Sequence, residues 1–377
     1  MKSTPNLLMF ADSEHDADML YAVGMFVPDP FIYLRIRGRA CVVMSDLEID
    51  RAKHQAPHCQ VISLSACQKK VAARGGKSIG AAAIIDLLAR EKGARSFVVP
   101  RNFPLGLALE LQRLGIRLQA AAGSLFPARE FKSADEIRKL TAAVRMAEAG
   151  MAAGIRMLKA SRIGPAKRLI HGGRPLTSER LRSAIDTAVL QAGGQASHTI
   201  VAGGKQGCDP HEGGHGPLRA HEPIILDIFP RCQETGYFGD ITRTVVRGRA
   251  SEAIRRLYQT VFDGQQLGFS RMRPGTESAS IHGAIQDLFH RSGYKTGRVG
   301  GRMQGFFHGT GHGLGLEIHE APRVGATSSG KLQPGQVVTV EPGLYYPSIG
   351  GVRLEDVAVI TGGAPRNLTR FEKVLEI

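Results

Sequence analysis

The chain has 377 residues, of which 42% are hydrophobic and 22% charged, a composition typical of a folded protein with two domains of ordinary size. No apolar run approaches the roughly 18 residues that a transmembrane helix requires, and the acidic residues after the short apolar patch near the N-terminus do not fit a secretory signal. We therefore expect a cytoplasmic protein that does not bind a membrane.

Charge and cysteine content exclude two further classes. The formal net charge is +15, but lysines and arginines are scattered, aromatic residues make up only 6%, and no nucleic-acid motif is visible. A generally basic surface without a specific nucleic-acid partner is the simpler interpretation. Five cysteines, an odd number without a C-x-x-C pair, predict reduced thiols instead of a disulfide framework or a cysteine zinc site.

The first third of the chain alternates short apolar runs with helical patterns. The runs RACVVMS (39–45), HCQVISLS (58–65) and ARSFVVP (94–100) and the helical stretch AAAIIDLLAR (81–90) predict an α/β domain. The stretch GGKSIG (75–80) suggests a phosphate loop, but the motif needs glycine where Val71 stands. We expect a helix start there instead.

Near Pro127 the sequence pattern changes from short apolar runs to a long helical stretch. Ser133 is followed three residues later by Glu136, a capping box that opens a long amphipathic helix. We expect two domains, 1–126 and 127–377. Two further helices are predicted over TSERLRSAIDTAVLQAG (177–193) and SEAIRRLYQTVFDGQQLGFSRM (251–272), with β-rich segments between and after them.

The stretch HEGGH (211–215) fits the zinc-protease pattern H-E-x-x-H, in which one helix presents both histidines to a single ion. Here both intervening residues are glycine, and prolines flank the stretch at Pro210 and Pro217. The sequence therefore predicts a loop and no helical zinc site.

Acidic residues stand inside apolar strand patterns. EPIILDIFP and GYFGDITRTVVRG, joined by a turn at Gly236, predict an antiparallel hairpin that carries Asp227 and Asp240. A buried carboxylate costs several kcal/mol unless a cation offsets it, so Asp227 needs a partner. One such aspartate is often a capping or turn residue, but two in one hairpin are harder to explain that way.

Two glutamates extend this set. VVTVEPGLYY places Glu341 at the end of a strand, and GGVRLEDVAVIT places Glu355 inside another. Strand alternation puts Arg353 on the same face as Glu355, where the arginine can orient the acid or form a structural salt bridge.

Histidines complete the set. His308, His312 and His319 stand in the glycine-rich stretch FFHGTGHGLGLEIHEAPR, and each alone is more often structural. Four acids and a histidine exceed the needs of one ion, and a mostly oxygen site favours Mn, Co, Fe or Zn. Two ions that share bridging carboxylates fit this inventory.

With these motifs, the whole chain resembles the pita-bread metallopeptidases, the family of aminopeptidase P, prolidase, methionine aminopeptidase and the metal-free creatinase. The chain from about Ser133 resembles the catalytic domain, and DADMLYAVGMFVPDPFIYLRIRGRACVVMSD (16–46) resembles the N-terminal domain of the creatinase and prolidase branch. The resemblance implies an α+β protein, in which a smaller creatinase-type α/β domain precedes a C-terminal pita-bread domain. It also implies a homodimer.

The resemblance implies a complete ligand set for two divalent ions, Mn, Co, Zn or Fe. Asp227 resembles the ligand of the first ion, and Asp240 and Glu355 resemble the bridging carboxylates. His312 and Glu341 resemble the ligands of the second ion.

It also implies roles for residues around the ions. His319 resembles the histidine that contacts the substrate carbonyl and its tetrahedral intermediate, and His211 resembles a histidine near the substrate. Glu212 and His215 are then incidental to the HEGGH match. Arg353 is a further candidate for substrate contact.

One departure from the family concerns the two aspartates. They are 13 residues apart (240 − 227), two more than in most members. An even insertion preserves strand phase, so both carboxylates can face one side, with an altered turn over 231–235. DIFP replaces the more usual small residues after the first aspartate and leaves the local pocket shape open.

The implied reaction is hydrolysis of the peptide bond before proline. Glu341 is the candidate proton shuttle, His319 the candidate oxyanion donor and His211 the residue that orients substrate. Xaa-Pro dipeptides are the first substrate class and longer Xaa-Pro peptides the alternative. Arg323, in HEAPR, is either a clamp for a dipeptide carboxylate or a solvated loop arginine. A different hydrolase or lyase, or a binding module on the same fold, also stays open.

Overall fold

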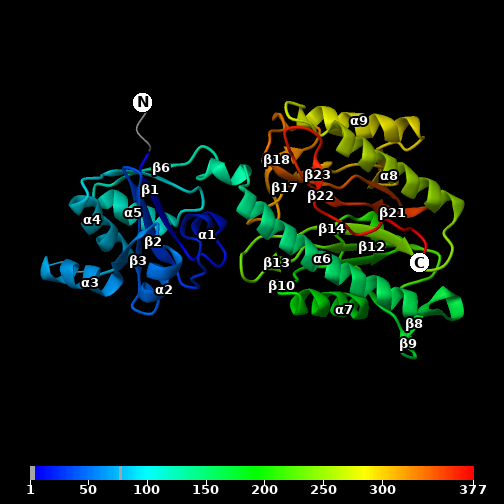
Figure 1. Cartoon of the computed structure of the whole chain (residues 1–377), viewed down its shortest axis with the longest axis horizontal. Coiled ribbons are helices and arrows are strands. Elements are labelled where there is room, and N and C mark those ends of the chain that lie inside the picture. The colour runs from blue at the N-terminus through cyan, green and yellow to red at the C-terminus, as the bar shows by residue number, and fades with distance from the viewer. Residues whose placement is uncertain (1–4, 76–78) are drawn as a thin grey trace. The chain divides into compact units, whose positions relative to one another are not determined.

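The computed structural model describes residues 5–75 and 79–377. Chain contacts divide it into two compact units, Met1–Arg129 and Glu130–Ile377. Figure 1 shows strands and helices in both units. Among the described residues, no helix combines the length and the apolar character needed to cross a bilayer.

The first unit is built on a mixed six-stranded sheet in the order β4-β3-β2-β1-β5-β6. The three strands β1, β2 and β3 pair antiparallel, and β4, β5 and β6 each join the sheet in parallel pairing. The strands are β1 (Leu7–Ala11), β2 (Phe31–Ile36), β3 (Arg39–Met44), β4 (Gln60–Ser63), β5 (Ser96–Val99) and β6 (Arg117–Ala120). The helices are α1 (Ala17–Val23), α2 (Ile49–Gln55), α3 (Leu64–Ala73), α4 (Ala81–Glu91) and α5 (Leu105–Arg113).

Alternation along the strands explains why this unit has two apolar cores. In β2, Leu34 packs in one core with Ile85 of α4, whereas Tyr33 packs in the other with Met19 of α1. Successive side chains of a strand point to opposite faces, so each face of the sheet needs its own cover of helices. The predicted α/β pattern is confirmed.

In the stretch predicted to start a helix, residues 76–78 lie outside the described residues. Gly80 is the N-cap of α4, which begins at Ala81.

The second unit contains an antiparallel three-stranded sheet, β11-β12-β14, and an antiparallel five-stranded sheet, β18-β17-β19-β22-β23. A bridge between Thr242 and Glu355 joins them. The strands are β7 (Arg162–Ile163), β8 (Leu169–His171), β9 (Arg174–Pro175), β10 (Gly194–Gln195), β11 (Ile200–Gly203), β12 (Pro223–Ile228), β13 (Arg231–Cys232), β14 (Ile241–Val246), β15 (Gly297–Val299), β16 (Arg302–Gln304), β17 (Gly311–Gly313), β18 (Glu320–Val324), β19 (Val337–Val340), β20 (Gly343–Tyr346), β21 (Gly350–Arg353), β22 (Asp356–Val359) and β23 (Arg366–Asn367).

Helices pack in two pairs on these sheets. The helices are α6 (Ala134–Ala160), α7 (Ser178–Gln191), α8 (Glu252–Arg271) and α9 (Ser278–Arg291), and short 3-10 turns lie at η1 (Pro127–Glu130), η2 (Pro165–Lys167) and η3 (Gln206–Cys208). The pair α6 and α7 shares a core with β11, β12 and β14, and α8 and α9 share one with β19 to β22. Figure 1 shows the strands between α7 and the pair α8 and α9.

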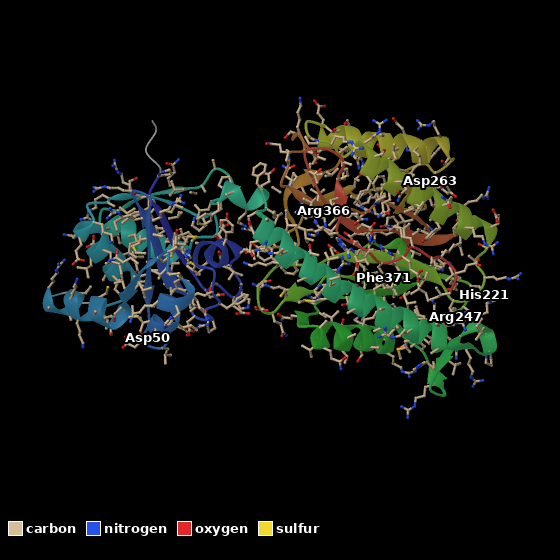
Figure 2. All side chains as sticks on the ribbon, in the orientation of Figure 1. Asp50, His221, Arg247, Asp263, Arg366 and Phe371 are labelled. Atoms are coloured by element: carbon tan, nitrogen blue, oxygen red, sulfur yellow. The ribbon has the colours of Figure 1, made fainter. Side chains whose placement is uncertain are left out.

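The outer faces of these helices are polar. Asp263 of α8, for example, is exposed (Figure 2). Apolar side chains on the other faces of α7 and α8, the helices predicted over 177–193 and 251–272, are buried in the cores.

The long helix α6 begins where the sequence predicts. The Ser133 hydroxyl accepts a hydrogen bond from the Glu136 N–H at 3.3 Å, and Oε2 of Glu136 accepts one from the Ser133 N–H at 2.8 Å. The capping box satisfies two N–H groups that would otherwise lack an intrahelical partner.

We expect Ser133→Ala to lower the free energy of unfolding by about 1 kcal/mol, because the variant loses the N-cap acceptor. Urea unfolding followed by circular dichroism measures the change. Ser133→Thr keeps the hydroxyl and serves as the matched control. An unchanged midpoint in Ser133→Ala would show that this cap does not stabilise the helix.

Candidate metal centre

Asp227 and Glu355 meet where the two sheets of the second unit join. Asp227 lies in β12 opposite Thr242 of β14, and Glu355 forms a bridge with the same threonine. The Thr242 hydroxyl lies 2.9 Å from Oδ1 of Asp227 and 2.8 Å from Oε2 of Glu355. A hydroxyl has one proton and donates to one carboxylate at a time. The other carboxylate therefore needs a proton or a cation.

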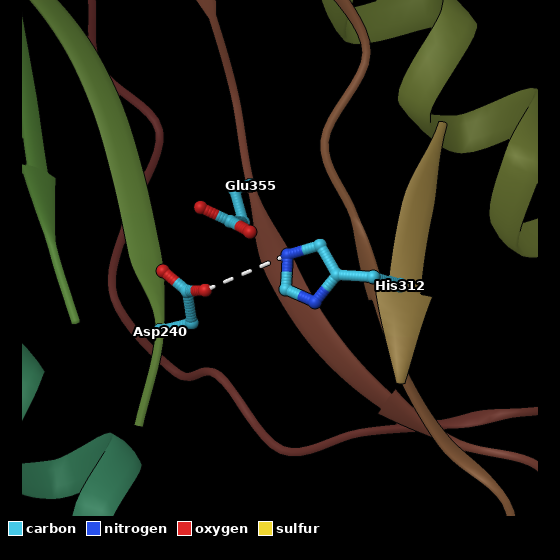
Figure 3. Close-up of side chains that lie close together, drawn as sticks. All are labelled: Asp240, His312 and Glu355. Atoms are coloured by element: carbon cyan, nitrogen blue, oxygen red, sulfur yellow. Dashed lines mark ion pairs between the residues drawn. The ribbon is translucent and has the colours of Figure 1, made fainter. Parts of the chain in front are cut away.

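Asp240 stands directly before β14, and Gly239 allows its strand to approach α6 closely. A Cβ added at Gly239 would lie 2.2 Å from the carbonyl oxygen of Ala143. Asp240 is buried, and the ligand atoms of Asp240, His312 and Glu355 lie within 4.8 Å of one another. Figure 3 shows these three side chains pointing toward one another from different strands and loops.

His312 presents a lone pair to this cluster. Its Nδ1 lies 3.1 Å from the carbonyl oxygen of Gly313, which can only accept, so Nδ1 carries the proton. Burial lowers the pKa of His312 to about 3, so the ring is neutral and Nε2 is an acceptor. Nε2 lies 3.3 Å from Oε1 of Glu341 and 3.9 Å from Oδ2 of Asp240. Donors that share one ion about 2.1 Å away are roughly 3 to 4 Å apart, so these groups fit a cation.

The acidic side chains of the cluster repel one another. Burial raises the pKa of Asp240 well above its usual value, and the neighbouring Asp227 and Glu341 raise it further. Burial does the same to Glu355, with added repulsion from Asp240. Burial also raises the pKa of Glu341, to about 7. Four carboxylates with Arg353 as their ion-paired guanidinium would leave about three negative charges for bound cations.

A chain of hydrogen bonds, buried at Arg353 and Tyr345 and part-buried at His308, runs from the Asp227 carboxylate. Nη2 of Arg353 lies 2.7 Å from Oδ2 of Asp227, and Nη1 donates to the Tyr345 hydroxyl at 3.0 Å. That hydroxyl lies 2.8 Å from Nε2 of His308, whose Nδ1 faces the Gly309 carbonyl at 2.8 Å. Burial raises the pKa of Tyr345 to about 12 and lowers that of His308 to about 3. Tyrosine therefore donates to a neutral histidine, and every proton in the chain has a fixed position.

Arg243 fixes the backbone beneath two of these residues. Its Nη1 donates to the carbonyl oxygens of Thr242 at 2.9 Å and Glu355 at 2.7 Å, and its Nη2 pairs with Asp356 at 2.9 Å. Because the guanidinium is buried and makes all of these hydrogen bonds, it holds the backbone in place where the two sheets join.

The structure corrects three local expectations. Glu355 does not lie inside a strand; it lies in the break between β21 and β22. Arg353 and Glu355 do face the same side, since both reach the Thr242 hydroxyl and both line one cavity, but Arg353 pairs with Asp227 and not with Glu355. The segment between the two aspartates is not a simple hairpin, since it contains β13, which pairs with β10. The antiparallel pairing of β12 with β14 and the position of Glu341 after β19 are as predicted.

A cavity of about 1250 Å³ opens beside the cluster. The predicted substrate contacts His211, His319 and Arg323 line it, as does Arg353. The ring centres of His319 and His312 are 4.4 Å apart, and Arg323 is the strand partner of His312 across β17 and β18. The wall of the cavity therefore combines the candidate metal ligands with cationic and imidazole groups.

The HEGGH stretch forms a loop, as its glycines predict. His211 is exposed in a turn and reaches the cavity, whereas His215 is exposed and its backbone bonds Gln206. Oε1 of Glu212 accepts from the Gly214 N–H at 3.1 Å. The loop has no helix to place His211 and His215 on one face.

Sequence reasoning missed two residues of the site, Thr242 and Tyr345. Thr242 stands two residues after Asp240, so strand alternation alone could have indicated a shared face. No sequence pattern indicated Tyr345, because its partners His308 and Arg353 come next to it only in the folded chain.

Comparisons with known proteins give consistent results. A family model described as "Metallopeptidase family M24" matches residues 138–362. The uncharacterized peptidase YqhT of Bacillus subtilis is 37% identical over 178 residues, 47% of this chain and 48% of that protein. The Xaa-Pro dipeptidase of Pyrococcus furiosus is 32% identical over 180 residues, 48% and 49% of the two chains. The chain thus spans about half the length of these curated relatives.

Solved structures match over nearly the whole chain. The Xaa-Pro dipeptidase from Bacillus anthracis superposes with a TM-score of 0.81 and 23% identity, covering 99% of this chain and 95% of that one. The X-Pro aminopeptidase from Thermotoga maritima gives a TM-score of 0.81 and 19% identity, covering 98% and 97%. These matches confirm the predicted fold, a pita-bread domain preceded by a smaller α/β domain.

The raised pKa of Glu341 predicts a pH dependence of stability in metal-free protein. The folded state retains the Glu341 proton at pH values where the unfolded state releases it. The contribution of Glu341 to the free energy of unfolding is therefore full below about pH 4.5 and is lost as pH rises through about 7. We expect the stability of wild type relative to Glu341→Gln to fall over that range, by about 1.4 kcal/mol per pKa unit.

Urea unfolding in chelator across this range measures the difference, and subtracting the variant removes the opposite contribution of the histidines. The exposed Glu110→Gln serves as the control and should leave the profile unchanged. A constant difference between wild type and Glu341→Gln would contradict the raised pKa.

Proposed function

The chain belongs to metallopeptidase family M24, and from this premise we propose that it hydrolyses the peptide bond before proline with the help of two divalent ions. Xaa-Pro dipeptides are the first proposed substrate. The observation that carries the proposal is the convergence of three buried carboxylates, the half-buried Glu341 and the lone pair of a neutral histidine, with Arg353 as the ion-paired guanidinium. Mn, Co, Zn or Fe suits this mixture of oxygen and nitrogen donors.

The proposed ligands are Asp227, Asp240, His312, Glu341 and Glu355. When bound, the ions would supply an activated water and a Lewis acid for the scissile carbonyl. The neutral His312 needs no deprotonation to serve as a ligand, since Nδ1 already carries its proton toward Gly313. The ordered bond from Arg353 would hold the Asp227 carboxylate in one orientation.

Proton handling is proposed for the side chains that reach the cavity. Glu341 lines the cavity and is the candidate to accept a proton from the attacking water and pass it to the leaving nitrogen. His319 is the candidate to donate a hydrogen bond to the oxygen that gains charge at the scissile carbonyl. His211, on the loop at the cavity wall, would orient the substrate. Arg353 forms an ion pair with Asp227, so we assign it the role of orienting this proposed ligand and not that of contacting the substrate.

The size of the cavity supports a second candidate, an aminopeptidase P that acts on longer peptides. A volume of about 1250 Å³ exceeds the roughly 300–1,000 Å³ of sites that enclose drug-sized ligands. A dipeptide would leave part of this space empty. A homodimer and a cytoplasmic location stay predictions from the sequence.

Metal content and peptide specificity test the proposal together. We expect about two ions per chain after stripping and reconstitution, with proline release that depends on them. Elemental analysis measures the ions, and a panel of Xaa-Pro dipeptides and Xaa-Pro-Xaa tripeptides measures the activity. Cleavage of tripeptides alone would favour aminopeptidase P, and His312→Ala that keeps full metal content and turnover would contradict the ligand assignment.

Arg323→Ala tests the carboxylate clamp. Loss of a charge-assisted hydrogen bond contributes about 1.5–3 kcal/mol, so we expect the KM for Xaa-Pro dipeptides to rise about 10-fold or more while tripeptides keep theirs. Steady-state kinetics on both substrate classes measure the difference. Arg323→Lys keeps the charge and should recover part of the effect, and equal changes on both classes would remove the clamp.

A further inference from the structure

Gln265 is a fully buried polar residue in the apolar core between α8 and the five-stranded sheet. Its exposed fraction is 0%, and it lies on the face of α8 that also buries Leu257 and Val261. Burial of an amide is unfavourable unless its polar atoms find partners. The position of this side chain therefore depends on the hydrogen bonds it makes.

Both hydrogen bonds of Gln265 go to backbone carbonyls next to proposed metal ligands. Nε2 donates to the carbonyl oxygen of Val340 at 2.9 Å and to that of Leu354 at 3.1 Å. Val340 directly precedes Glu341, and Leu354 directly precedes Glu355. Because carbonyls only accept, the NH₂ end of the amide must face them, which fixes its orientation.

The two peptide planes are held at both ends. The carbonyl of Val340 shares a plane with the N–H of Glu341, which donates to the Thr310 carbonyl at 2.8 Å. The carbonyl of Leu354 shares a plane with the N–H of Glu355, which donates to the Thr242 carbonyl at 3.0 Å. One amide group thus links the planes from which two ligand side chains project.

Glycines on α8 allow close packing on its buried side. A Cβ added at Gly268 would lie 3.2 Å from Cγ1 of Val340, and one added at Gly264 would lie 2.6 Å from Cε1 of Phe289 in the neighbouring helix α9. Both glycines are within one turn of Gln265 on the buried side. Oε1 of Gln265 has no hydrogen-bond partner among the residues that the structure describes. The amide therefore donates to both carbonyls, while its own oxygen stays without a donor among the described residues.

We propose that Gln265 is a positioning residue of the metal centre, which sets the spacing of Glu341 and Glu355 by tying together the peptide units that precede them. The inference rests on the proposed function, because it gives these two glutamates the role of ligands. It assigns no contact with substrate to Gln265 itself.

Gln265→Leu and Gln265→Glu test the assignment. Leucine removes both donors from a side chain of similar size, and glutamate keeps the length but lacks the NH₂ group. We expect both variants to bind Mn²⁺ about 10- to 100-fold more weakly, as is typical when a group that orients a ligand is lost. Calorimetric titration of the stripped protein measures the affinity, and circular dichroism identifies which variants are folded.

Gln336→Leu is the matched control. Gln336 is also buried at 1% exposure, and its amide bonds Glu130 and the backbone of Gln333, away from the ligands. Its loss should affect stability but leave Mn²⁺ affinity at the wild-type value. Kinetics at saturating Mn²⁺ add a second readout, in which the kcat of the Gln265 variants should fall further than that of Gln336→Leu.

The outcomes separate this inference from the function on which it rests. Wild-type Mn²⁺ affinity in a folded Gln265 variant, with an active wild-type protein, would overturn the positioning role alone. An equal loss of affinity in Gln336→Leu would also overturn it, because general loosening of the core would explain both results. A wild-type protein that binds no metal would overturn the proposed function and this inference with it.

Discussion

Electrostatic repulsion among three buried carboxylates and the half-buried Glu341 is the constraint on which the candidate centre depends. A buried charge is unfavourable unless it is paired, and Asp227 alone has an ion-paired guanidinium, from Arg353. Burial and mutual repulsion raise the pKa values of Asp240 and Glu355, so these groups favour a proton or a cation. The fold therefore holds together, at considerable cost, a site that divalent ions would stabilise.

The positions of three of these carboxylates follow from interruptions of regular strands, whereas Asp227 lies inside β12. Asp240 precedes β14, Glu341 follows β19, and Glu355 lies between β21 and β22. Within a continuous strand, alternate side chains point to opposite faces, and neighbouring strands add side chains at a fixed spacing. The breaks allow side chains from separate strands to converge on one point. They also leave the backbone dependent on side chains such as Arg243 for its hydrogen bonds.

Local sequence patterns predicted the parts of this structure that depend on local interactions. The capping box at Ser133 and the strand that ends before Glu341 follow from spacing within a few residues. The pairing of Arg353 with Asp227 joins residues 126 positions apart, and no periodicity reveals it. The apolar pattern around Glu355 predicted one continuous strand. The structure has a break there instead, because a break in a strand depends on contacts from other elements. The site could be proposed from residue types, but its hydrogen bonds could not.

Side chains behind the carboxylates, Arg243 and Gln265, explain why the repelling acids stay close together. Arg243 and Gln265 donate to the backbone next to a proposed ligand, at the carbonyl oxygens of Glu355 and Leu354, which belong to adjacent peptide units of one strand break. A strand break that was merely flexible would let the carboxylates separate and relieve their repulsion. Two buried donor groups on adjacent carbonyls oppose that movement, since each carbonyl would lose a partner in the apolar interior. These backbone hydrogen bonds keep the acids close together, and the proposed cations would relieve the resulting repulsion.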